Sequence, residues 1–210
     1  MTDKFPRVVL ATRNRGKIDE IRDLLADLAV RVQSLDDYPE LGEIEEDGRT
    51  FAENAVKKAA AVALHVGAPA LADDSGLEVE ALGGRPGVYS SRYAPTAQER
   101  NARLLAELEG VAADRRAARF VCVAALADPY GRAVTRTGTC PGWIALAPAG
   151  GGGFGYDPIF LLPDRSRTLA QLDRAAKNAI SHRGQAFRAI GEVLRRVLEK
   201  HGGRIPIPET

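Results

Sequence analysis

Residues 71–76 read Leu71-Ala72-Asp73-Asp74-Ser75-Gly76, an apolar stretch that ends in two adjacent carboxylates, a hydroxyl and a glycine. Carboxylates that lose hydration repel each other, so such a pair persists mainly beside a cation or strong hydrogen-bond donors. Ligation by oxygen alone suits Mg²⁺, which takes one or two carboxylates together with waters and phosphate oxygens. A second interpretation stays open, namely a strand followed by an Asp-Ser-Gly turn whose side chains cap backbone groups.

The composition is that of a folded protein without a strong overall charge. The 210 residues, 45% of them hydrophobic, can bury a full core and fit one domain, residues 1–210, with two lobes. Because 29 basic and 28 acidic residues leave a net charge of +1, no overall field favours nucleic acid or an anionic membrane. Cys122 and Cys140 are too few for a disulfide framework, and no stretch resembles a signal segment or a bilayer span. We expect a cytoplasmic protein that binds neither nucleic acid nor a membrane.

Hydrophobic periodicity predicts alternating strands and helices. Strands are expected at residues 7–11, 30–35, 70–73 and 77–82, and an antiparallel hairpin at 120–127 and 133–139. Helices are expected at 17–29, from a Thr50 cap to about residue 65, at 96–108 and, interrupted near Ser181, at 168–200. The pattern indicates a mixed α/β fold in which the hairpin region forms a second lobe, with a cleft between the lobes.

Two segments in the N-terminal part could bind phosphate or metal. Thr12-Arg13-Asn14-Arg15-Gly16-Lys17 joins a strand to a helix, where free N–H groups, a glycine and a lysine form an anion cradle. An ordinary turn capped by Thr12 or Asn14 explains the same residues. In the segment from Glu45 to Lys58, a carboxylate could complete a metal site, with Asn54 and Lys57 or Lys58 projecting from the helix; a solvated acidic face is the alternative.

Two further segments have the character of a site for a flat ligand. Gly151-Gly152-Gly153-Phe154-Gly155-Tyr156-Asp157-Pro158 lets the backbone approach closely, while Phe154 or Tyr156 offers a stacking face and Asp157 an acceptor. In Lys177-Asn178-Ala179-Ile180-Ser181-His182-Arg183-Gly184, Ser181 is expected to cap the last helix, so that His182 and Arg183 lie in its first turn. A flexible loop and surface decoration are the respective alternatives.

Six short segments follow one another along nearly the whole chain. They are Ala-Thr-x-Asn-x-Gly-Lys at 11–17, Gly-x-Thr-Phe-x-Glu-Asn-Ala at 48–55, Ala-Asp-Asp-Ser-Gly-Leu at 72–77, Gly-Gly-x-Pro-Gly-Val-Tyr-Ser at 83–90, Gly-Phe-Gly-Tyr-Asp-Pro-Ile-Phe at 153–160 and Lys-Asn-x-Ile-Ser-His-Arg at 177–183. In this order they resemble the inosine/xanthosine triphosphate pyrophosphatase family. The resemblance implies an elongated α/β protein with a mixed central sheet, flanking helices and an active cleft between two lobes. It also implies a homodimer and Mg²⁺-dependent cleavage of ITP, dITP or XTP into monophosphate and pyrophosphate.

The resemblance also assigns roles to residues at matching positions. Asp74 would accept the proton of the attacking water and bind the metal together with Glu46, with Asp73 in support and Glu45 as an alternative to Glu46. Ser75 would touch the substrate. The triphosphate would be held by Thr12, Arg13, Asn14, Arg15, Gly16 and Lys17. The base and sugar would be enclosed by Phe154, Gly155, Tyr156, Asp157, Lys177, His182 and Arg183. Ser91 and Pro95 depart from the family, which more often has Ala and Gly there, but neither is a proposed ligand.

The expected chemistry is coherent without the family. Mg²⁺ on phosphate oxygens neutralises charge while a carboxylate takes the proton of the attacking water. Hypoxanthine and xanthine carry a 6-oxo acceptor where adenine has a donor amine, so N–H donors from His182, Arg183 and the backbone would favour the former. Two other functions stay open: a metal-dependent phosphatase acting on another nucleotide or a sugar phosphate, and a nucleotide-binding protein without turnover.

Overall fold

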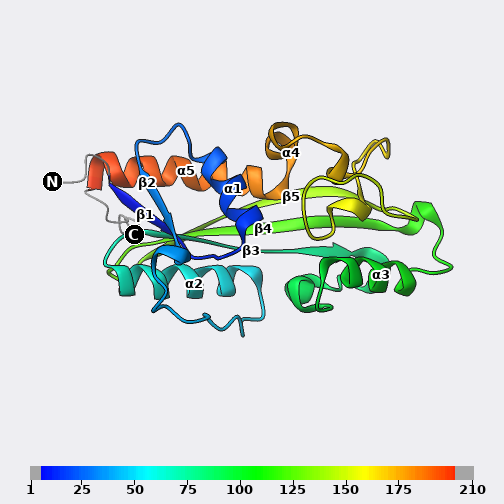
Figure 1. Ribbon diagram of the computed structural model, residues 1–210, viewed down its shortest axis with the longest axis horizontal. Helices are drawn as coiled ribbons and strands as arrows, with labels where there is room; N and C mark the ends of the chain where they lie inside the picture. Colours follow the sequence, from blue (N-terminus) through cyan, green and yellow to red (C-terminus); the bar gives the residue numbers. More distant parts are fainter. Residues whose placement is uncertain (1–5, 202–210) are drawn as a thin grey trace, which may run out of the picture. The chain divides into compact units, whose positions relative to one another are not determined.

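A computed structural model describes residues 6–201 of the protein (Figure 1). Six strands form one mixed sheet in the order β2-β1-β3-β4-β5-β6. The strands are β1 (Arg7–Leu10), β2 (Arg31–Ser34), β3 (Ala70–Val79), β4 (Ala117–Ala127), β5 (Ala133–Ile144) and β6 (Phe160–Leu161). The helices are α1 (Arg15–Leu24), α2 (Phe51–Val66), α3 (Ala97–Glu107), α4 (Arg174–Ile180) and α5 (His182–His201). The α/β class with a mixed central sheet and flanking helices is therefore confirmed.

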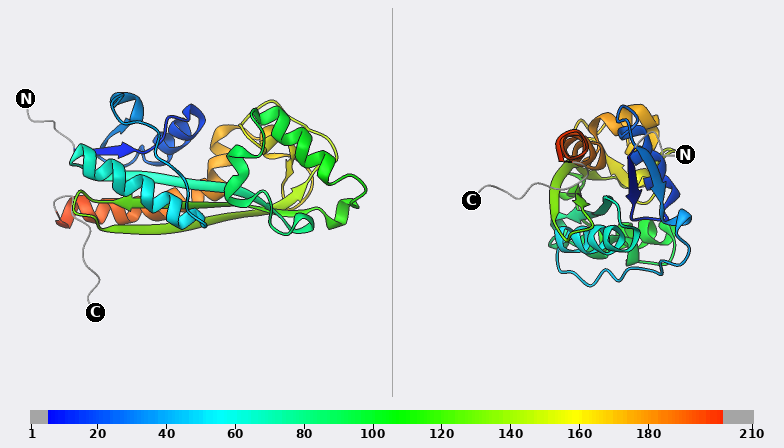
Figure 2. Two further views of the ribbon diagram at one scale, coloured as in Figure 1. Left: turned by 90° about the horizontal axis from the view of Figure 1, so that it is seen from below. Right: turned by 90° about the vertical axis from the view of Figure 1, so that its left-hand side faces the viewer.

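The described chain divides into two compact units. Unit 1 contains the chain up to Asp74, Val123–Thr137 and the chain from Ala186 onward, and unit 2 contains Ser75–Cys122 and Gly138–Gln185. Three long strands, β3, β4 and β5, contribute residues to both units, and Figure 2 shows β4 and β5 as neighbouring strands. Within residues 6–201, no helix is both long and apolar enough to cross a bilayer.

Unit 1 is organised around parallel strands. β1 pairs in parallel with β2 and with β3, where Val9 lies opposite Ala70 and Leu10 opposite Leu71. The small residues of α2 let the helix pack closely against β1, because Ala55, Ala59 and Ala63 are fully buried. Thr50 caps α2 in a capping box with Glu53, as the sequence predicts, and Gly67 ends the helix in a left-handed conformation.

Unit 2 has its own hydrophobic core. Its buried members come from β3, α3, β4, β5, β6 and the loops beside them, and they are Leu77, Val79, Tyr93, Leu104, Leu108, Phe120, Cys140, Ile144, Tyr156, Ile159, Phe160, Leu162 and Leu169. Thr96 caps α3 in a second capping box, with Glu99. Ser181 lies between α4 and α5 and accepts a hydrogen bond from the Gly184 N–H, which confirms both the predicted break and the predicted cap.

The predicted turn at residues 73–76 is wrong. β3 runs without interruption from Ala70 to Val79, so both acids lie inside the strand and not at its end. The separate strand expected at 77–82 is the second half of β3, followed by a 3₁₀ turn at Glu80–Leu82. Asp-Ser-Gly is a turn-like sequence, but tertiary partners that satisfy the carboxylates override that local preference.

Three other boundaries differ from those expected. α1 begins at Arg15 and ends at Leu24, five residues before the predicted end, because the chain turns there to enter β2. The last helical region begins at Arg174 and not at residue 168, because Asp173 caps α4 by accepting from the Ala176 N–H. β5 continues to Ile144 and not only to residue 139, because its last residues, Trp143 and Ile144, pair with β6.

Candidate active site

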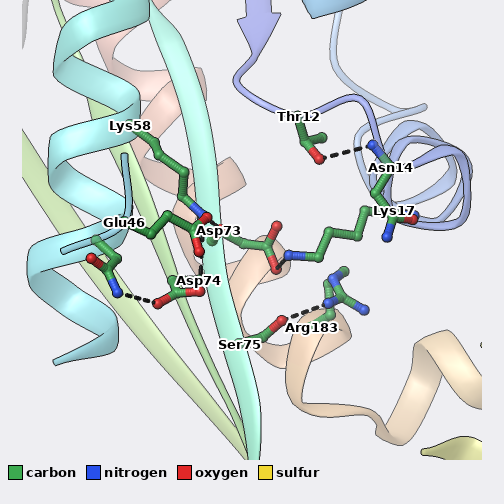
Figure 3. Close-up of polar contacts among 10 residues, drawn as sticks. Thr12, Asn14, Lys17, Glu46, Lys58, Asp73, Asp74, Ser75 and Arg183 are labelled. Carbon is green, nitrogen blue, oxygen red and sulfur yellow. Dashed lines mark hydrogen bonds and ion pairs between the residues drawn. The ribbon is translucent and has the colours of Figure 1, made fainter. Parts of the chain in front are cut away.

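The two acids of β3 have different partners. Successive side chains of a strand point to opposite faces, so Asp73 and Asp74 contact different elements. The Asp73 carboxylate lies 3.1 Å from the Lys17 ammonium of α1. The Asp74 carboxylate accepts a 2.9 Å hydrogen bond from the Asn54 amide of α2 (Figure 3). Asp73 is only 2% and Asp74 only 5% exposed, so both carboxylates depend on these partners.

Lys58 of α2 joins the second carboxylate to the acidic loop. Its ammonium lies 2.5 Å from Glu46 Oε1, 2.6 Å from the Asp73 carbonyl oxygen and 3.8 Å from Asp74 Oδ1. Figure 3 shows these groups on one side of β3. Glu45, the alternative to Glu46, is exposed. The geometry therefore favours Glu46 as the second acid of the cluster, which we call the carboxylate cluster: Glu46, Lys58 and Asp74.

Asn54 fixes the acidic loop against Asp74. Its side-chain oxygen accepts a 2.8 Å hydrogen bond from the Gly48 N–H, while its amide donates to Asp74. Asn54 is fully buried, and a Cβ at Gly48 would lie 2.6 Å from the Asn54 oxygen. Only glycine therefore lets the loop approach Asn54 this closely. One amide thus holds both the loop that carries Glu46 and the carboxylate that faces it.

Burial raises the pKa of Asp74 above its usual value. The negative charge of Glu46 raises the pKa further, while Lys58, the hydrogen bond from Asn54 and the charge of Lys17 lower it; the net direction is upward. A raised pKa makes a carboxylate a better proton acceptor, provided that it is ionised at the working pH. The environment of Asp74 is therefore that of a candidate general base.

The donor set of the carboxylate cluster fits a hard divalent cation. Among the described residues, the Lys58 ammonium faces three oxygens, two from carboxylates and one from a carbonyl. Among the residues that the structure describes, no three or more His, Cys, Asp or Glu side chains converge as a complete metal site. Mg²⁺ needs no such cage, since it retains waters and takes oxygens from a phosphate substrate. The residues present therefore fit Mg²⁺ as a shared ligand of protein and substrate.

The strand-to-helix segment 12–17 combines helix capping with a lysine that pairs with β3. Thr12 accepts from the Asn14 N–H, and Asn14 caps α1 by accepting from the Lys17 N–H. The Arg13 guanidinium lies 2.6 Å from the Leu41 carbonyl, so it holds the loop after β2. The capped-turn interpretation is thus correct for Thr12 and Asn14. Lys17 remains directed at Asp73, and the N–H groups of the first turn of α1 can still face an anion.

In unit 2, the start of α5 is tied to β3. The Arg183 guanidinium donates a 2.9 Å hydrogen bond to the Ser75 hydroxyl (Figure 3). Arg183 is buried, and so is His182, whose ring stacks on Phe120 with centroids 4.6 Å apart and planes at 10°. The predicted cap at Ser181 therefore does place His182 and Arg183 in a first helical turn, where both side chains are ordered by packing.

Phe154 of the glycine-rich loop lies against two cations. The Lys177 ammonium is 4.5 Å and the Arg183 guanidinium 5.3 Å from the centre of its ring. The Asp157 carboxylate fixes this arrangement, because it accepts from the Phe154 N–H at 2.7 Å and pairs with Lys177 at 2.6 Å. Gly153 has a φ of +67°, and a Cβ there would collide with Asp157. The structure thus brings four predicted residues, Phe154, Asp157, Lys177 and Arg183, into one group, which we call the aromatic cluster.

Tyr156 does not offer the stacking face that its sequence context suggested. Its ring belongs to the core of unit 2, and its hydroxyl donates to the Ser90 carbonyl at 2.9 Å. Burial raises the pKa of this phenol well above its usual value. The physical reason is the 3₁₀ turn at Asp157–Ile159, which turns the chain inward so that Tyr156 anchors the loop and Phe154 remains near the cations.

Several residues contact the site although the sequence motifs assign them no definite role. The sequence places Asn54 and Lys58 on a helix, and their spacing of four residues puts both on one face of it. In the structure this face meets β3. Glu53 caps α2 by accepting from the Thr50 N–H, and Lys57 pairs with Asp47 at 2.6 Å. Asn101 of α3 donates to the Gly155 carbonyl, and no local pattern predicts that contact.

Comparisons with known proteins identify relatives over almost the full length. The sequence model of the Ham1 family matches residues 8–193. The dITP/XTP pyrophosphatase of Desulforamulus reducens is 51% identical over 194 residues, which cover 91% of this chain and 96% of the relative. The dITP/XTP pyrophosphatase of Geobacter sulfurreducens is 50% identical over 184 residues, which cover 86% of this chain and 92% of that protein.

Solved structures give the same result for the fold. A HAM1 protein from Coxiella burnetii aligns with a TM-score of 0.82 and 45% identity, covering 90% of this chain and 98% of the other. A structure from Mycobacterium abscessus described as a nucleoside-triphosphatase and dITP/XTP pyrophosphatase aligns with a TM-score of 0.71 and 42% identity, covering 88% of this chain and 98% of the other.

Proposed function

Because the chain belongs to the Ham1 family, we propose that it hydrolyses the non-standard purine nucleoside triphosphates ITP, dITP and XTP to the monophosphate and pyrophosphate. The names of the dITP/XTP pyrophosphatases from Desulforamulus reducens and Geobacter sulfurreducens support this activity. The observation that carries the proposal is the buried Asp74 carboxylate, with its raised pKa, facing Glu46 across the Lys58 ammonium. Removal of such triphosphates from the nucleotide pool is the corresponding house-cleaning role.

In this proposal Glu46 and Asp74 bind Mg²⁺, and Asp73 supports the site through its pair with Lys17. A cation held by these residues would supply charge neutralisation at the phosphate oxygens of the substrate. Asp74 accepts the proton of the attacking water, for which its raised pKa is suited. Lys17 and the N–H groups at the start of α1 bind phosphate oxygens of the substrate.

Unit 2 is proposed to select the base. The Phe154 ring offers a stacking face, and the ring is already held by Lys177 and Arg183. Donors of His182, Arg183 and the backbone match the 6-oxo acceptor of hypoxanthine and xanthine and would remain unpaired against adenine. Asp74 and Ser75 are consecutive residues of β3, so the proposed chemical and recognition residues are linked directly along the chain.

Mg²⁺ as the metal, a homodimer as the assembly and the cytoplasm as the location are part of the same proposal. The oxygen-only donor set supports Mg²⁺. The dimer is implied by the family resemblance and the cytoplasm by the sequence composition, and both stay predictions. Size-exclusion chromatography with light scattering tests the assembly.

A panel of nucleoside triphosphates, assayed with Mg²⁺ for pyrophosphate, tests the activity. We expect pyrophosphate from ITP, dITP and XTP and much less from ATP. Orthophosphate alone would indicate a phosphatase acting on another phosphate ester, and Mg²⁺-dependent binding of ITP without turnover would indicate a nucleotide-binding protein. Either result would contradict the proposal.

A further inference from the structure

The Lys58 ammonium is surrounded by the same atoms that would bind a metal ion. It lies 2.5 Å from Glu46 Oε1, 2.6 Å from the Asp73 carbonyl and 3.8 Å from Asp74 Oδ1. Its side chain is only 9% exposed, so these oxygens replace much of the hydration that the charge would have in water. The side chain leaves α2 one residue after Lys57, whose ammonium pairs instead with the exposed Asp47.

The ammonium also has an electrostatic purpose. The Glu46 and Asp74 carboxylates both face the Lys58 ammonium, and its positive charge offsets the repulsion between their negative charges. With two negative charges and one positive charge, the carboxylate cluster still has a net charge of −1. It is therefore stabilised by Lys58 and yet remains attractive to a further cation.

We propose that Lys58 is the resident cation of the metal-free protein and that its ammonium leaves the position between Glu46 and Asp74 when Mg²⁺ binds there. This inference rests on the proposed function, from which it takes the metal site. Mg²⁺ needs carboxylate oxygens at about 2.1 Å, and an ammonium already in contact with Glu46 would meet a divalent charge at close range. The flexible lysine side chain can rotate away, whereas the two carboxylates are fixed by β3 and by the loop tied to Asn54.

The exchange explains why the site is ordered before any metal arrives. Without a counter-ion, the buried Asp74 carboxylate and the partly buried Glu46 carboxylate would separate or take up protons. The Lys58 ammonium keeps the two carboxylates together until it is displaced, so the metal binds to ligands that are already in position. The same exchange lowers the affinity for free Mg²⁺, because binding must first displace an ion pair.

The decisive experiment compares Mg²⁺ affinities without nucleotide. Calorimetric titration with MgCl₂ alone would be carried out on the wild type, Lys58→Met and the matched control Lys57→Met, which removes the same charge one residue earlier on α2. We expect Lys58→Met to bind Mg²⁺ about tenfold more tightly than the wild type, and Lys57→Met to differ by less than about twofold. An affinity of Lys58→Met equal to or below that of the wild type, including no binding by either protein, would overturn the inference.

A second readout uses the unmodified protein and so does not depend on the folding of a variant. Acylation of lysines by an amine-reactive ester, followed by mass spectrometry, reports how accessible each ammonium is. The Lys58 acylation rate should rise when MgCl₂ is added, while the Lys57 rate should stay constant. A Lys58 rate that does not change across a full MgCl₂ titration would contradict the exchange.

These measurements separate the inference from the proposed function. A protein that shows the exchange but releases no pyrophosphate from ITP would contradict the proposed function alone. A protein that releases pyrophosphate from ITP but shows no change in Lys58 accessibility or in the affinity of Lys58→Met would contradict the inference alone.

Discussion

The carboxylate cluster of unit 1 and the aromatic cluster of unit 2 both place a lysine against acidic side chains, but they differ in the number and the burial of the acids. Lys58 serves two carboxylates, Glu46 and Asp74, and approaches only the first of them closely. Lys177 serves one carboxylate, Asp157, at 2.6 Å, and both side chains of this pair are almost completely buried. The first cluster keeps a net negative charge that a further cation can use, whereas in the second the charges of Lys177 and Asp157 cancel each other. We therefore expect the Lys58 site to exchange its cation and the Lys177–Asp157 pair to act as a structural support.

The largest effect is expected from Asp74→Asn. The substitution keeps the shape of the side chain and removes the proposed proton acceptor, so kcat for ITP should fall by about 10²- to 10⁴-fold. Steady-state kinetics measures the loss, and circular dichroism with thermal unfolding verifies that the fold is intact. A variant with near wild-type turnover would remove Asp74 from the role of base.

Lys177→Ala tests whether the Lys177–Asp157 pair is a structural support. Because it removes the ammonium that neutralises the buried Asp157, we expect the free energy of unfolding to fall by about 3–5 kcal/mol. Affinity for a non-hydrolysable ITP analogue, measured by calorimetry, should fall as well, because Phe154 loses a cation that holds its ring. The double variant Lys177→Met with Asp157→Asn removes both charges and should recover part of the stability. Unchanged stability and affinity would show that Lys177 is dispensable to both roles.

Glu46→Gln tests whether the carboxylate cluster is a cation site. Loss of one metal-binding carboxylate should raise the Mg²⁺ concentration needed for half-maximal activity by about tenfold. Glu45→Gln is the matched control, because it removes the same charge from the neighbouring exposed residue and should leave that concentration unchanged. An equal effect of both substitutions would mean that the acidic loop acts through its overall charge and not through Glu46.

The smallest effect is expected at Glu107, which shows what a partly exposed ion pair contributes. Hydrogen bonds from Tyr93 and then Arg103 lower the pKa of this glutamate, and its side chain is 25% exposed. A group whose pKa is lowered by folding stabilises the protein above its unfolded pKa and loses that contribution as the pH falls through the folded value. Relative to Glu107→Gln, the wild type should be more stable by about 0.5–1 kcal/mol at neutral pH.

Chemical denaturation of both proteins at several pH values would measure this difference. The advantage of the wild type should shrink as the pH falls below the usual range of glutamate and disappear in stronger acid. A difference that stays constant with pH would assign the stabilisation to packing and not to the charge of Glu107.

The sequence predicts features that depend on neighbouring residues better than features that depend on distant ones. The caps at Thr50 and Ser181 follow from local hydrogen bonding and are confirmed. The prediction of a turn at residues 73–76 is wrong, because Lys17, Asn54 and Lys58 contact this segment from elements that are remote in the sequence.

The same distinction applies to the candidate site. The grouping of Phe154, Asp157 and Lys177 could be anticipated from motifs, but the inward orientation of Tyr156 could not, because it depends on a core assembled from segments far apart in the sequence. Asn54 and Lys58 fall between these cases. Their four-residue spacing indicates a common helix face, whereas the strand that they meet is known only from the fold.

Because β3 is continuous, its alignment with β1 determines which element each of its two aspartates contacts. β3 is positioned by its pairing with β1, where Val9 lies opposite Ala70 and Leu10 opposite Leu71. A shift of one residue would turn every side chain of the strand to the opposite face. Deletion of one residue between Ala70 and Asp73 would bring Asp74 to the place opposite Lys17 and Ser75 to the place beside Asn54, whereas an insertion there would bring Asp73 beside Asn54 and Asp74 one place further along the strand. In either case only one of the two places would keep an aspartate, so the ladder of backbone hydrogen bonds decides which acid faces α2.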